Sequence, residues 1–584
     1  MLLRLLLIAA VAVVLFVPQV SLAADDVKQP TAVGTRGAAA TVDLLGTRAA
    51  IHTLRAGGNA VDAAVAAAAV LGVTEPYSAG IGGGGFMLIR TPDGKVTTID
   101  SREESPLAMR PDSFMENGSP LPFAAARWSG LSAGVPGTVA GWELALDRYG
   151  SWSLRRTLRA GARVARNGFE VDQTFVAQTQ PAIPWFDDVP STEAIYLDED
   201  GTAPDVGELV RNPDLARTYR LIGKHGAQAF YSGPLAEAIV DAVREPPIAP
   251  DADHVWRPGL MTEQDLAAYE AIEREPTHVS YRGLDVWGMG PPSSGGSTVG
   301  EALNILEGYA DLARDRVRAL HLFLEASRFS FADRNAYLAD PDFFDVPLSG
   351  LLSDSFAAER RALIDPTRAA TSPVAPGNPY DDEGNAGRVG RASFQPGQST
   401  THLVVSDRYG TVVSYTFTIE STGGNGIVVP GWGFLLNNEL TDFNYDSLTH
   451  PNRADGGKRP RSSMSPTIVT RAGEPLLALG SPGGSTIITT VLQVLMERLD
   501  LGADLPTAIA RPRATQRNTA VTSAEPAFIS SPEAAALSSL YGHVFGNPQE
   551  IGAVTGLDFL GDGRVLAAAE PVRRGGGSAA TVRP

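Results

Sequence analysis

The sequence feature that most constrains the fold is an abrupt change of composition at residue 400. Residues 366–399 are rich in Pro, Gly, Asp and Arg without apolar periodicity, which predicts an exposed, mobile segment. Residues 402–407 and 411–418 alternate in polarity, contain many β-branched and aromatic residues, and flank a Tyr-Gly turn. This pattern predicts a β-hairpin. Thr400 therefore stands where an exposed segment meets a buried strand.

A cut in front of Thr400 would give this residue a particular chemistry. It would then carry both a hydroxyl group and a free α-amine. An α-amine titrates at about 8, so it can accept the hydroxyl proton near neutral pH, and threonine with its own amine is an activated nucleophile. However, Thr-Thr at the start of a strand is usually explained by β-propensity alone. Other motifs must decide between these interpretations.

Composition limits the classes of protein that remain. The 584 residues are 43% hydrophobic and 20% charged, which is ordinary globular material, and large α/β enzymes of this length often form one unit. A formal net charge of −18 argues against binding to nucleic acid, which requires basic patches. The chain has no cysteine, which excludes disulfides and thiolate chemistry. Its eight histidines are scattered without ligand spacing, so we expect no metal and no organic cofactor.

The N-terminus has the features of an export signal. Arg4 precedes an apolar run over residues 5–17, and Ser21-Leu-Ala23 offers small residues for cleavage after Ala23. The apolar run ends at Pro18 and is shorter than the roughly 20 residues that a spanning helix needs. The sequence thus predicts a signal peptide over residues 1–23, no stable membrane span, and a periplasmic or extracellular protein.

Helix and strand patterns divide the remaining chain. Residues 41–72 predict two Ala-rich helices broken at Gly57-Gly58, and residues 86–90 and 95–100 predict a hairpin. Residues 281–287 predict one strand, and 550–584 a short hairpin ending in Gly-rich residues. Further helices are expected around 151–167, 213–224, 232–243, 262–270, 298–311, 317–339 and 485–499. Together these patterns indicate an α/β protein with hairpin-rich sheets inside and helices outside.

Two glycine motifs need an alternative interpretation. Gly82–Gly85 lacks the Lys-Ser/Thr of a phosphate loop and precedes a strand, so close backbone packing explains it better. Gly130-Leu-Ser-Ala-Gly134 matches a nucleophile elbow, but Pro136 would disrupt the helix that must follow. We therefore expect Ser132 to be structural.

Four motifs together resemble the γ-glutamyltranspeptidase family of self-cleaving N-terminal-nucleophile hydrolases, and the similarity extends over nearly the whole chain after residue 23. They are Thr400-Thr-His402, Leu435-Leu-Asn-Asn438 with Asp442, Arg461-Ser-Ser-Met-Ser-Pro466 and Gly480-Ser-Pro-Gly-Gly484. The resemblance implies a four-layer αββα sandwich and cleavage between Ser399 and Thr400. It also implies a heterodimer of a large chain (24–399) and a small chain (400–584) that form one folded unit.

The resemblance assigns catalytic roles. Thr400 is the expected nucleophile, and Thr418 matches a family threonine that assists its amine. Gly483 and Gly484 are expected to bind the oxyanion at the start of a helix, where free N–H groups suit a developing negative charge. Ala332–Tyr337 also resembles the family, but helix termination is a sufficient explanation for that motif.

The substrate-binding roles come from the same resemblance. Arg102, with Ser462 and Ser463, is expected to hold the substrate α-carboxylate, and Asp442, with Glu439 nearby, the α-ammonium. A guanidinium group can hold a carboxylate with two parallel hydrogen bonds. The alternatives are a solvated Arg102–Glu103 ion pair and serines that only form a turn.

Two departures from the family pattern concern specificity. Many members carry asparagine where this chain has Glu420, and an ionised carboxylate only accepts hydrogen bonds. Glu420 is therefore expected to favour the donor ammonium and to repel its carboxylate unless Arg102 compensates. Only 19 residues (443–461) separate Asp442 from Ser462, fewer than in members with a lid loop. An open site predicts that hydrolysis outweighs transpeptidation and that large γ-glutamyl donors are accepted.

The expected function is that of an exported, self-cleaving γ-glutamyltranspeptidase or glutathione hydrolase. It would transfer the γ-glutamyl group of glutathione or a related compound to water, an amino acid or a peptide. The nearer alternative is an acylase of the same fold that takes glutaryl or cephalosporin side chains. The other alternative is a secreted binding protein that has lost catalysis, against which the intact Thr400, glycine pair and Arg102 argue.

Overall fold

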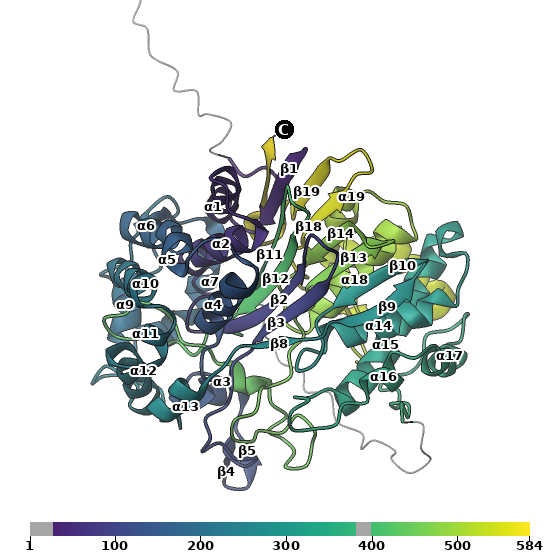
Figure 1. Cartoon of the computed structure of the whole chain (residues 1–584). Helices are drawn as coiled ribbons and strands as arrows, with labels where there is room; N and C mark the ends of the chain where they lie inside the picture. The colour runs from purple at the N-terminus through teal and green to yellow at the C-terminus, as the bar shows by residue number, and fades with distance from the viewer. Residues whose placement is uncertain (1–26, 381–398, 584) are drawn as a thin grey trace, which may run out of the picture.

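Two antiparallel sheets lie at the centre of this computed structural model, which describes residues 27–380 and 399–583 (Figure 1). The predicted signal peptide and residues 381–398 of the predicted exposed segment lie outside the described residues. The first sheet has the order β8 (Ile272–Arg274), β3 (Val96–Ser101), β2 (Gly84–Arg90), β12 (Val412–Thr418), β11 (Thr401–Asp407), β1 (Thr31–Thr41) and β20 (Ser578–Arg583). The second has the order β19 (Val565–Ala569), β18 (Thr555–Phe559), β14 (Glu474–Gly480), β13 (Thr467–Arg471), β10 (Leu284–Gly288) and β9 (Thr277–Tyr281).

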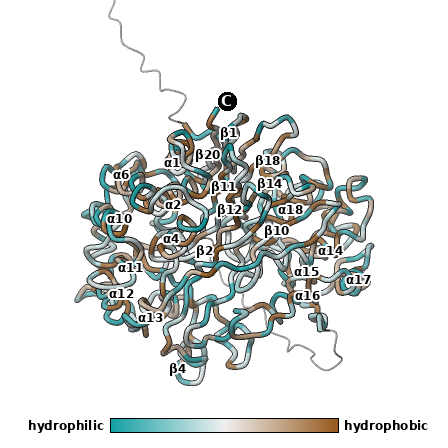
Figure 2. The backbone as a smooth tube through the Cα atoms, in the orientation of Figure 1, coloured by the Kyte–Doolittle hydropathy of each residue, from teal (hydrophilic) through white to brown (hydrophobic). Residues whose placement is uncertain are grey.

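The long strand β1 joins the two sheets. Thr31–Gly34 pairs with β19 in the second sheet, whereas Gly37–Thr41 pairs with β11 in the first. The sheets share a layer of apolar side chains that includes Leu88, Val404 and Ala478. Because side chains alternate along a strand, the neighbours of Leu88 and Val404 point the other way, toward the helices. Figure 2 shows hydrophobic segments, in brown, along these central strands.

Helices cover the outer face of each sheet. The first sheet carries α1 (Leu44–Arg55), α2 (Ala60–Thr74), α4 (Thr138–Tyr149), α6 (Arg159–Asn167) and α10 (Pro213–His225), and the second carries α14 (Gly295–Glu307), α15 (Arg316–Tyr337) and α18 (Thr486–Leu499). The αββα sandwich expected from the resemblance is confirmed. Within residues 27–380 and 399–583, no helix has both the length and the apolarity to span a membrane.

The helices and hairpins that the sequence predicts around Thr400 and Arg102 are present. Helices α1 and α2 are separated at Gly57-Gly58, and Asn59 with Asp62 forms a capping box that starts α2. The two predicted hairpins are β2–β3 and β11–β12. Ser132 lies in a short 3₁₀ turn, where its hydroxyl donates to backbone oxygens of Arg127 and Ser129, as a structural serine would.

Two predictions of secondary structure are wrong. Residues 281–287 are not one strand, because Arg282 and Gly283 have positive φ (52° and 71°) and turn the chain between β9 and β10. The hairpin predicted within residues 550–584 is present as β18–β19, but the chain does not end in the Gly-rich residues that follow it. It forms β20, which pairs with β1 and completes the first sheet. Pairing to a strand more than 500 residues away in sequence leaves no local signal.

Candidate active site

The bond between Ser399 and Thr400 lies at the start of β11 in a strained conformation. Thr400 has a φ of 83°, which is rare for a β-branched residue and costs energy. The carbonyl oxygen of Ser399 accepts a hydrogen bond from the Gly483 N–H at 3.2 Å. The scissile bond predicted from the sequence is therefore strained on one side, and its carbonyl already faces an N–H donor.

Thr418 is the cross-strand neighbour of Thr400. Strands β11 and β12 pair Thr401 with Phe417, so Thr400 and Thr418, the next residue on each side, lie opposite each other. The Oγ1 atoms of Thr400 and Thr418 are 3.0 Å apart. The Glu420 N–H donates to Thr418 Oγ1 at 2.9 Å. Because Thr418 Oγ1 accepts this bond, its own proton is available to Thr400 Oγ1.

Gly483 and Gly484 form the turn before α18. Their φ values are 132° and 55°, a region that favours glycine. A Cβ atom on Gly483 would lie 2.6 Å from Thr486 Oγ1, so a larger residue would displace the turn. The turn directs the Gly483 N–H toward Ser399, as an oxyanion site requires.

A small cavity of about 60 Å³ brings most of the predicted site residues together. Of those predicted, the cavity is lined by Arg102, Thr400, Thr418, Glu420, Glu439, Asp442, Ser462, Ser463 and Gly484. Arg334 and Arg461 also line it. Ser399 and Gly483 do not line this cavity, and Gly483 lines a second one together with Thr422 and Arg574. The hairpin, the 435–442 segment, the serine loop and the α18 turn thus converge as the resemblance implied.

Arg102 is buried rather than solvated, with 1% of its surface exposed. One terminal nitrogen donates to Glu439, the other donates to Asp442 Oδ2 at 2.5 Å, and Nε donates to the Pro460 carbonyl at 3.1 Å. Burial opposes the charge of Arg102, but the carboxylates of Glu439, Asp442 and Glu103 outweigh it and raise the pKa of this guanidinium. The interpretation of Arg102 as an exposed ion pair is therefore wrong. A cation and an anion lie side by side here, as a zwitterionic ligand requires.

Glu103 is a buried acid at the edge of this cluster. Its carboxylate is 3.8 Å from Arg102 Nη1, and neither of its oxygens has a hydrogen-bond partner among the described residues. Burial raises the pKa of Glu103 to about 7 and that of Glu439 well above its usual range. Protonation of one of these acids relieves the excess of carboxylates around a single arginine.

Glu420 is also buried beside Thr400 and has a positive φ of 75°. Burial raises its pKa to about 7, the charge of Asp442 acts in the same direction, and hydrogen bonds from Ser421 and Asn438 oppose them. Near neutral pH Glu420 is therefore only partly ionised, whereas the sequence analysis expects an ionised carboxylate.

Arg334 is a site residue that the sequence analysis missed. Its Nη2 donates to Ser463 Oγ at 2.7 Å, and its Nε donates to Ser294 Oγ at 2.8 Å. No carboxylate of the described residues lies within 4.0 Å of this buried guanidinium. Helix α15 ends at Tyr337, as the motif Ala332–Tyr337 predicts, but the arginine of this motif also lines the cavity. The resemblance of this motif to the family was the sequence signal that could have identified Arg334, since helix termination alone needs no arginine.

Arg574 is a second residue without a sequence signal. It lies near the C-terminus, where its Nη1 donates to the Thr400 carbonyl at 2.6 Å and its Nη2 donates to Ser78 Oγ at 2.8 Å. It therefore fixes the backbone directly after the scissile bond. Only the pairing of β20 with β1 brings this segment to the site.

The short 443–461 segment does not cover the cavity. It packs on the body, where Asn452 Nδ2 donates to the Asp442 carbonyl at 2.8 Å and the Arg461 N–H donates to Asn452 Oδ1 at 2.8 Å. Of this segment only Arg461 lines the cavity. The described residues also include two groups of three His, Asp or Glu donors within 4.8 Å of one another, and both lie elsewhere.

An αββα sandwich with a threonine at the head of an inner strand, next to a glycine turn that faces its carbonyl, defines the class of N-terminal-nucleophile hydrolases. Residues 46–580 match the family described as Gamma-glutamyltranspeptidase. The chain belongs to this family of enzymes.

Individual relatives include two kinds of enzyme. A "Glutathione hydrolase proenzyme" of Bacillus subtilis (strain 168) is 39% identical over 501 residues, which cover 84% of this chain and 82% of the relative. An "Acylase ACY 1 proenzyme" of Pseudomonas sp. (strain SE83) is 33% identical over 555 residues and 93% of each chain. The crystal structure of cephalosporin acylase from Bacillus halodurans superposes with a TM-score of 0.81 and 29% identity over 97% of this chain and 99% of that one.

Proposed function

We propose that this protein is an exported, self-cleaving enzyme that hydrolyses γ-glutamyl compounds, including glutathione, through an acyl-enzyme on Thr400. The observation that carries the proposal is the Arg102–Asp442 pair in the cavity of Thr400. A γ-glutamyl group ends in an α-carboxylate and an α-ammonium, which can exchange with the two members of this pair. The N-terminal export signal lies outside the described residues and rests on the sequence alone.

Self-cleavage begins with attack of Thr400 Oγ1 on the carbonyl carbon of Ser399. The amide nitrogen leaves as the amine of Thr400, and an ester joins Ser399 to the Thr400 side chain. Water then opens this ester to give the Ser399 carboxylate and the free hydroxyl. The Gly483 N–H at the Ser399 oxygen stabilises the oxyanion, and the strain at Thr400 is released.

Hydrolysis of substrate repeats this chemistry. The free α-amine accepts the proton of Thr400 Oγ1, which attacks the γ-carbonyl carbon of the donor. Thr418 positions the hydroxyl, and the N–H groups of Gly483 and Gly484 bind the oxyanion. The amine of the donor leaves with a proton, and water or an acceptor amine releases the γ-glutamyl ester.

The cavity favours γ-glutamyl donors over the glutaryl donors of an acylase. A glutaryl group has the second carboxylate but no ammonium. Three arginines, Arg102, Arg334 and Arg461, and three acids, Glu420, Glu439 and Asp442, line the cavity with Thr400. A glutaryl group can use the arginines but leaves Asp442 without a cationic partner, whereas the ammonium of a γ-glutamyl group supplies one.

Comparison of γ-glutamyl- and glutaryl-p-nitroanilide tests the proposal. A charge-assisted bond to the ammonium contributes about 1.5–3 kcal/mol, so kcat/KM should favour the γ-glutamyl donor by about 10- to 100-fold. Glycylglycine should barely accelerate release of nitroaniline, because the 443–461 segment does not cover the cavity. Equal or faster use of the glutaryl donor would identify an acylase. A many-fold acceleration by glycylglycine would refute the preference for water.

Arg334→Gln is expected to weaken binding of the donor carboxylate. Since Arg334 donates to Ser463 Oγ, the hydroxyl proton of Ser463 is left to donate to the substrate. We expect KM for γ-glutamyl-p-nitroanilide to rise about tenfold, the loss of roughly 1.4 kcal/mol. KM for 4-aminobutyryl-p-nitroanilide, which lacks the carboxylate, should not change. Arg318→Gln on the same helix is the control, and an equal rise for both donors would assign Arg334 a purely structural role.

Glu420 is expected to make donor binding depend on pH. Because burial raises its pKa to about 7, the carboxylate is mostly protonated at pH 6 and mostly ionised at pH 8. If the ionised form binds the ammonium, KM falls as the pH rises through about 7. Glu420→Gln should remove this step, whereas Glu75→Gln should retain it, since the pKa of Glu75 is also raised to about 7 but Glu75 does not line the cavity. An unchanged step in Glu420→Gln would contradict this role.

A further inference from the structure

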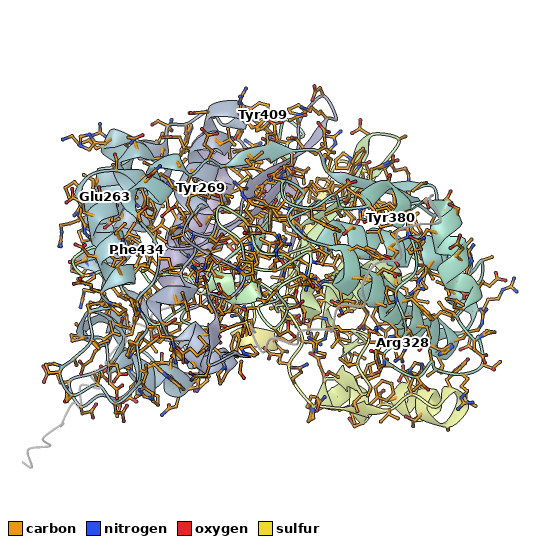
Figure 3. All side chains as sticks on the ribbon, turned by 90° about the horizontal axis from the view of Figure 1, so that it is seen from below. Glu263, Tyr269, Arg328, Tyr380, Tyr409 and Phe434 are labelled. Atoms are coloured by element: carbon orange, nitrogen blue, oxygen red, sulfur yellow. The ribbon has the colours of Figure 1, made fainter. Side chains whose placement is uncertain are left out.

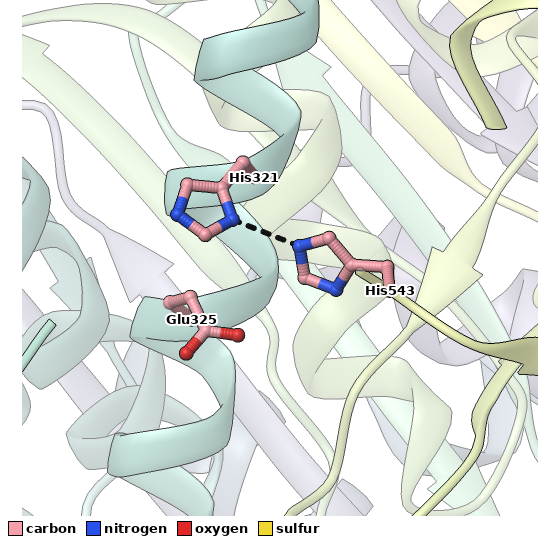
Figure 4. A group of neighbouring side chains, drawn as sticks. All are labelled: His321, Glu325 and His543. Atoms are coloured by element: carbon pink, nitrogen blue, oxygen red, sulfur yellow. Dashed lines mark hydrogen bonds between the residues drawn. The ribbon is translucent and has the colours of Figure 1, made fainter. Parts of the chain in front are cut away.

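His321, Glu325 and His543 are buried together outside the active site (Figure 4), and we propose that they bind a divalent transition-metal ion. Two imidazoles and a carboxylate are a donor set that suits zinc. The sequence analysis found no ligand spacing among the histidines. The fold brings together two histidines that are 222 residues apart.

The donor atoms are close to the arrangement that an ion requires. His321 Nδ1 and His543 Nε2 are 2.9 Å apart, and the three donor atoms lie within 4.8 Å of one another. Two nitrogens on a tetrahedral zinc ion, each at about 2.0–2.1 Å, are about 3.3 Å apart. His321 and Glu325 are four residues apart on α15 and therefore share one face of the helix. The two histidine nitrogens would have to move apart by about 0.4 Å to bind the same ion.

The hydrogen bonds of His321 prepare it as a ligand. Its Nε2 lies 3.0 Å from the Asp365 carbonyl oxygen, which can only accept, so Nε2 carries a proton. The lone pair of the neutral ring is then on Nδ1, which faces His543. A backbone carbonyl at the remote nitrogen is the usual partner of a metal-binding histidine. Tyr541 stacks on the ring with centroids 4.2 Å apart and fixes its orientation. Burial also lowers the pKa of both histidines, which is the direction that favours the neutral imidazoles needed for metal binding.

Glu325 retains capacity for an ion despite its present partners. Its Oε1 accepts from Arg328 Nε at 3.1 Å, and its Oε2 accepts from the Ala370 N–H at 3.0 Å. Arg328 Nη2 also lies 3.1 Å from Oε1, so the acceptor site that remains for an ion is on Oε2, since each carboxylate oxygen has about two lone-pair sites. Metal-binding carboxylates are themselves hydrogen-bonded as a rule. Arg328, labelled in Figure 3, forms an ion pair with Glu325 and balances its charge. A cavity of about 570 Å³ lined by Arg328, Asp365 and His543 provides an entry path.

The position of the site gives the ion a structural role. His321 and Glu325 precede residue 400, and His543 follows it. After the proposed self-cleavage, the ion would link the large chain to the small one. It would also anchor α15, the helix that carries Arg334 into the catalytic cavity. The link between chains rests on the proposed function, but metal binding itself does not.

Metal binding is tested on untagged, cleaved protein with Zn²⁺ as the probe. We expect one equivalent of Zn²⁺ per heterodimer in calorimetric titration of chelator-treated protein, and visible absorption bands on substitution with Co²⁺. His543→Ala should weaken the affinity by about 100-fold or more, because even the loss of a hydrogen-bond partner of a ligand costs 10- to 100-fold. His254→Gln removes a ligand from the other group of donors, Asp188, Asp253 and His254, and should change nothing. Zn²⁺ should raise the melting temperature of the wild type but not of His543→Ala.

Two results would overturn the inference: no stoichiometric binding by the wild type, or equal affinity in His543→Ala. Glu325→Gln keeps the shape of the side chain and serves as a second variant if His543→Ala does not fold, with cleavage into two chains as the check on folding. Activity on γ-glutamyl-p-nitroanilide is measured separately. Since no group of this cluster touches Thr400 in the cavity, an inactive protein that binds zinc would refute only the proposed function.

Discussion

Thr400→Ala is expected to leave the chain uncut and inactive. The wild type should run as two chains, residues 24–399 and 400–584, which contain 376 and 185 residues. Without Oγ1 no ester can form at Ser399, and no nucleophile remains for the substrate, so activity should fall by several orders of magnitude. Electrophoresis and intact-mass measurement check the first part, and γ-glutamyl-p-nitroanilide the second.

Thr401→Ala is the matched control for this experiment. Thr401 is the buried neighbour of Thr400, and its hydroxyl has no hydrogen-bond partner among the described residues. We expect this variant to cleave normally and to keep most of its activity. Normal cleavage of Thr400→Ala would show that another residue or another protein cuts the chain, and Thr400 would then not be the nucleophile of processing.

Arg102→Lys is expected to raise KM for the γ-glutamyl donor by about 10- to 100-fold. Lysine keeps the charge but cannot place two donors on Glu439 and Asp442 or on a substrate carboxylate. Each charge-assisted bond contributes about 1.5–3 kcal/mol, and 1.4 kcal/mol corresponds to a factor of ten. Steady-state kinetics on the cleaved variant measure the change.

The exposed Arg110, paired with Asp112 on the surface, provides the control, since Arg110→Lys should leave KM unchanged. Cleavage of Arg102→Lys into two chains should proceed, because the Arg102 guanidinium bonds to Glu439, Asp442 and the backbone at Pro460 and Arg461, away from the scissile bond. A change of less than twofold would mean that Arg102 supports the fold and does not hold the substrate.

The sequence predicted the site well where residues lie close together along the chain. Thr400 and Thr418 face each other because one hairpin joins them, and the pattern of residues 402–418 defines that hairpin. Gly483 and Gly484 were placed correctly because the end of a strand and the start of a helix are both visible around them. The roles of these residues in catalysis came from the resemblance. The position of Thr400, Thr418 and Gly484 in one cavity, with the Gly483 N–H on the Ser399 carbonyl, supports it.

The sequence alone did not predict contacts made across the fold. Arg334 lies on a helix of the second outer layer, and its bond to Ser463 depends on how α15 packs against the serine loop. Arg574 reaches the Thr400 carbonyl only because β20 pairs with β1. His543 contacts His321 only because the fold packs its segment against α15, 222 residues away in sequence. No local sequence pattern reveals that Arg102 is buried between Glu439 and Asp442. The hydroxyl of Tyr269, which is labelled in Figure 3, donates to the Arg102 carbonyl in the same region.

The most direct test of the central claim is the mass of the small chain during turnover. The cleaved protein is mixed with γ-glutamyl-p-nitroanilide, stopped with acid, and its two chains are weighed and fragmented. We predict a small chain that begins at Thr400 and carries one γ-glutamyl group as an ester on that residue. A chain that begins elsewhere, or a γ-glutamyl group attached to another residue, would contradict the account.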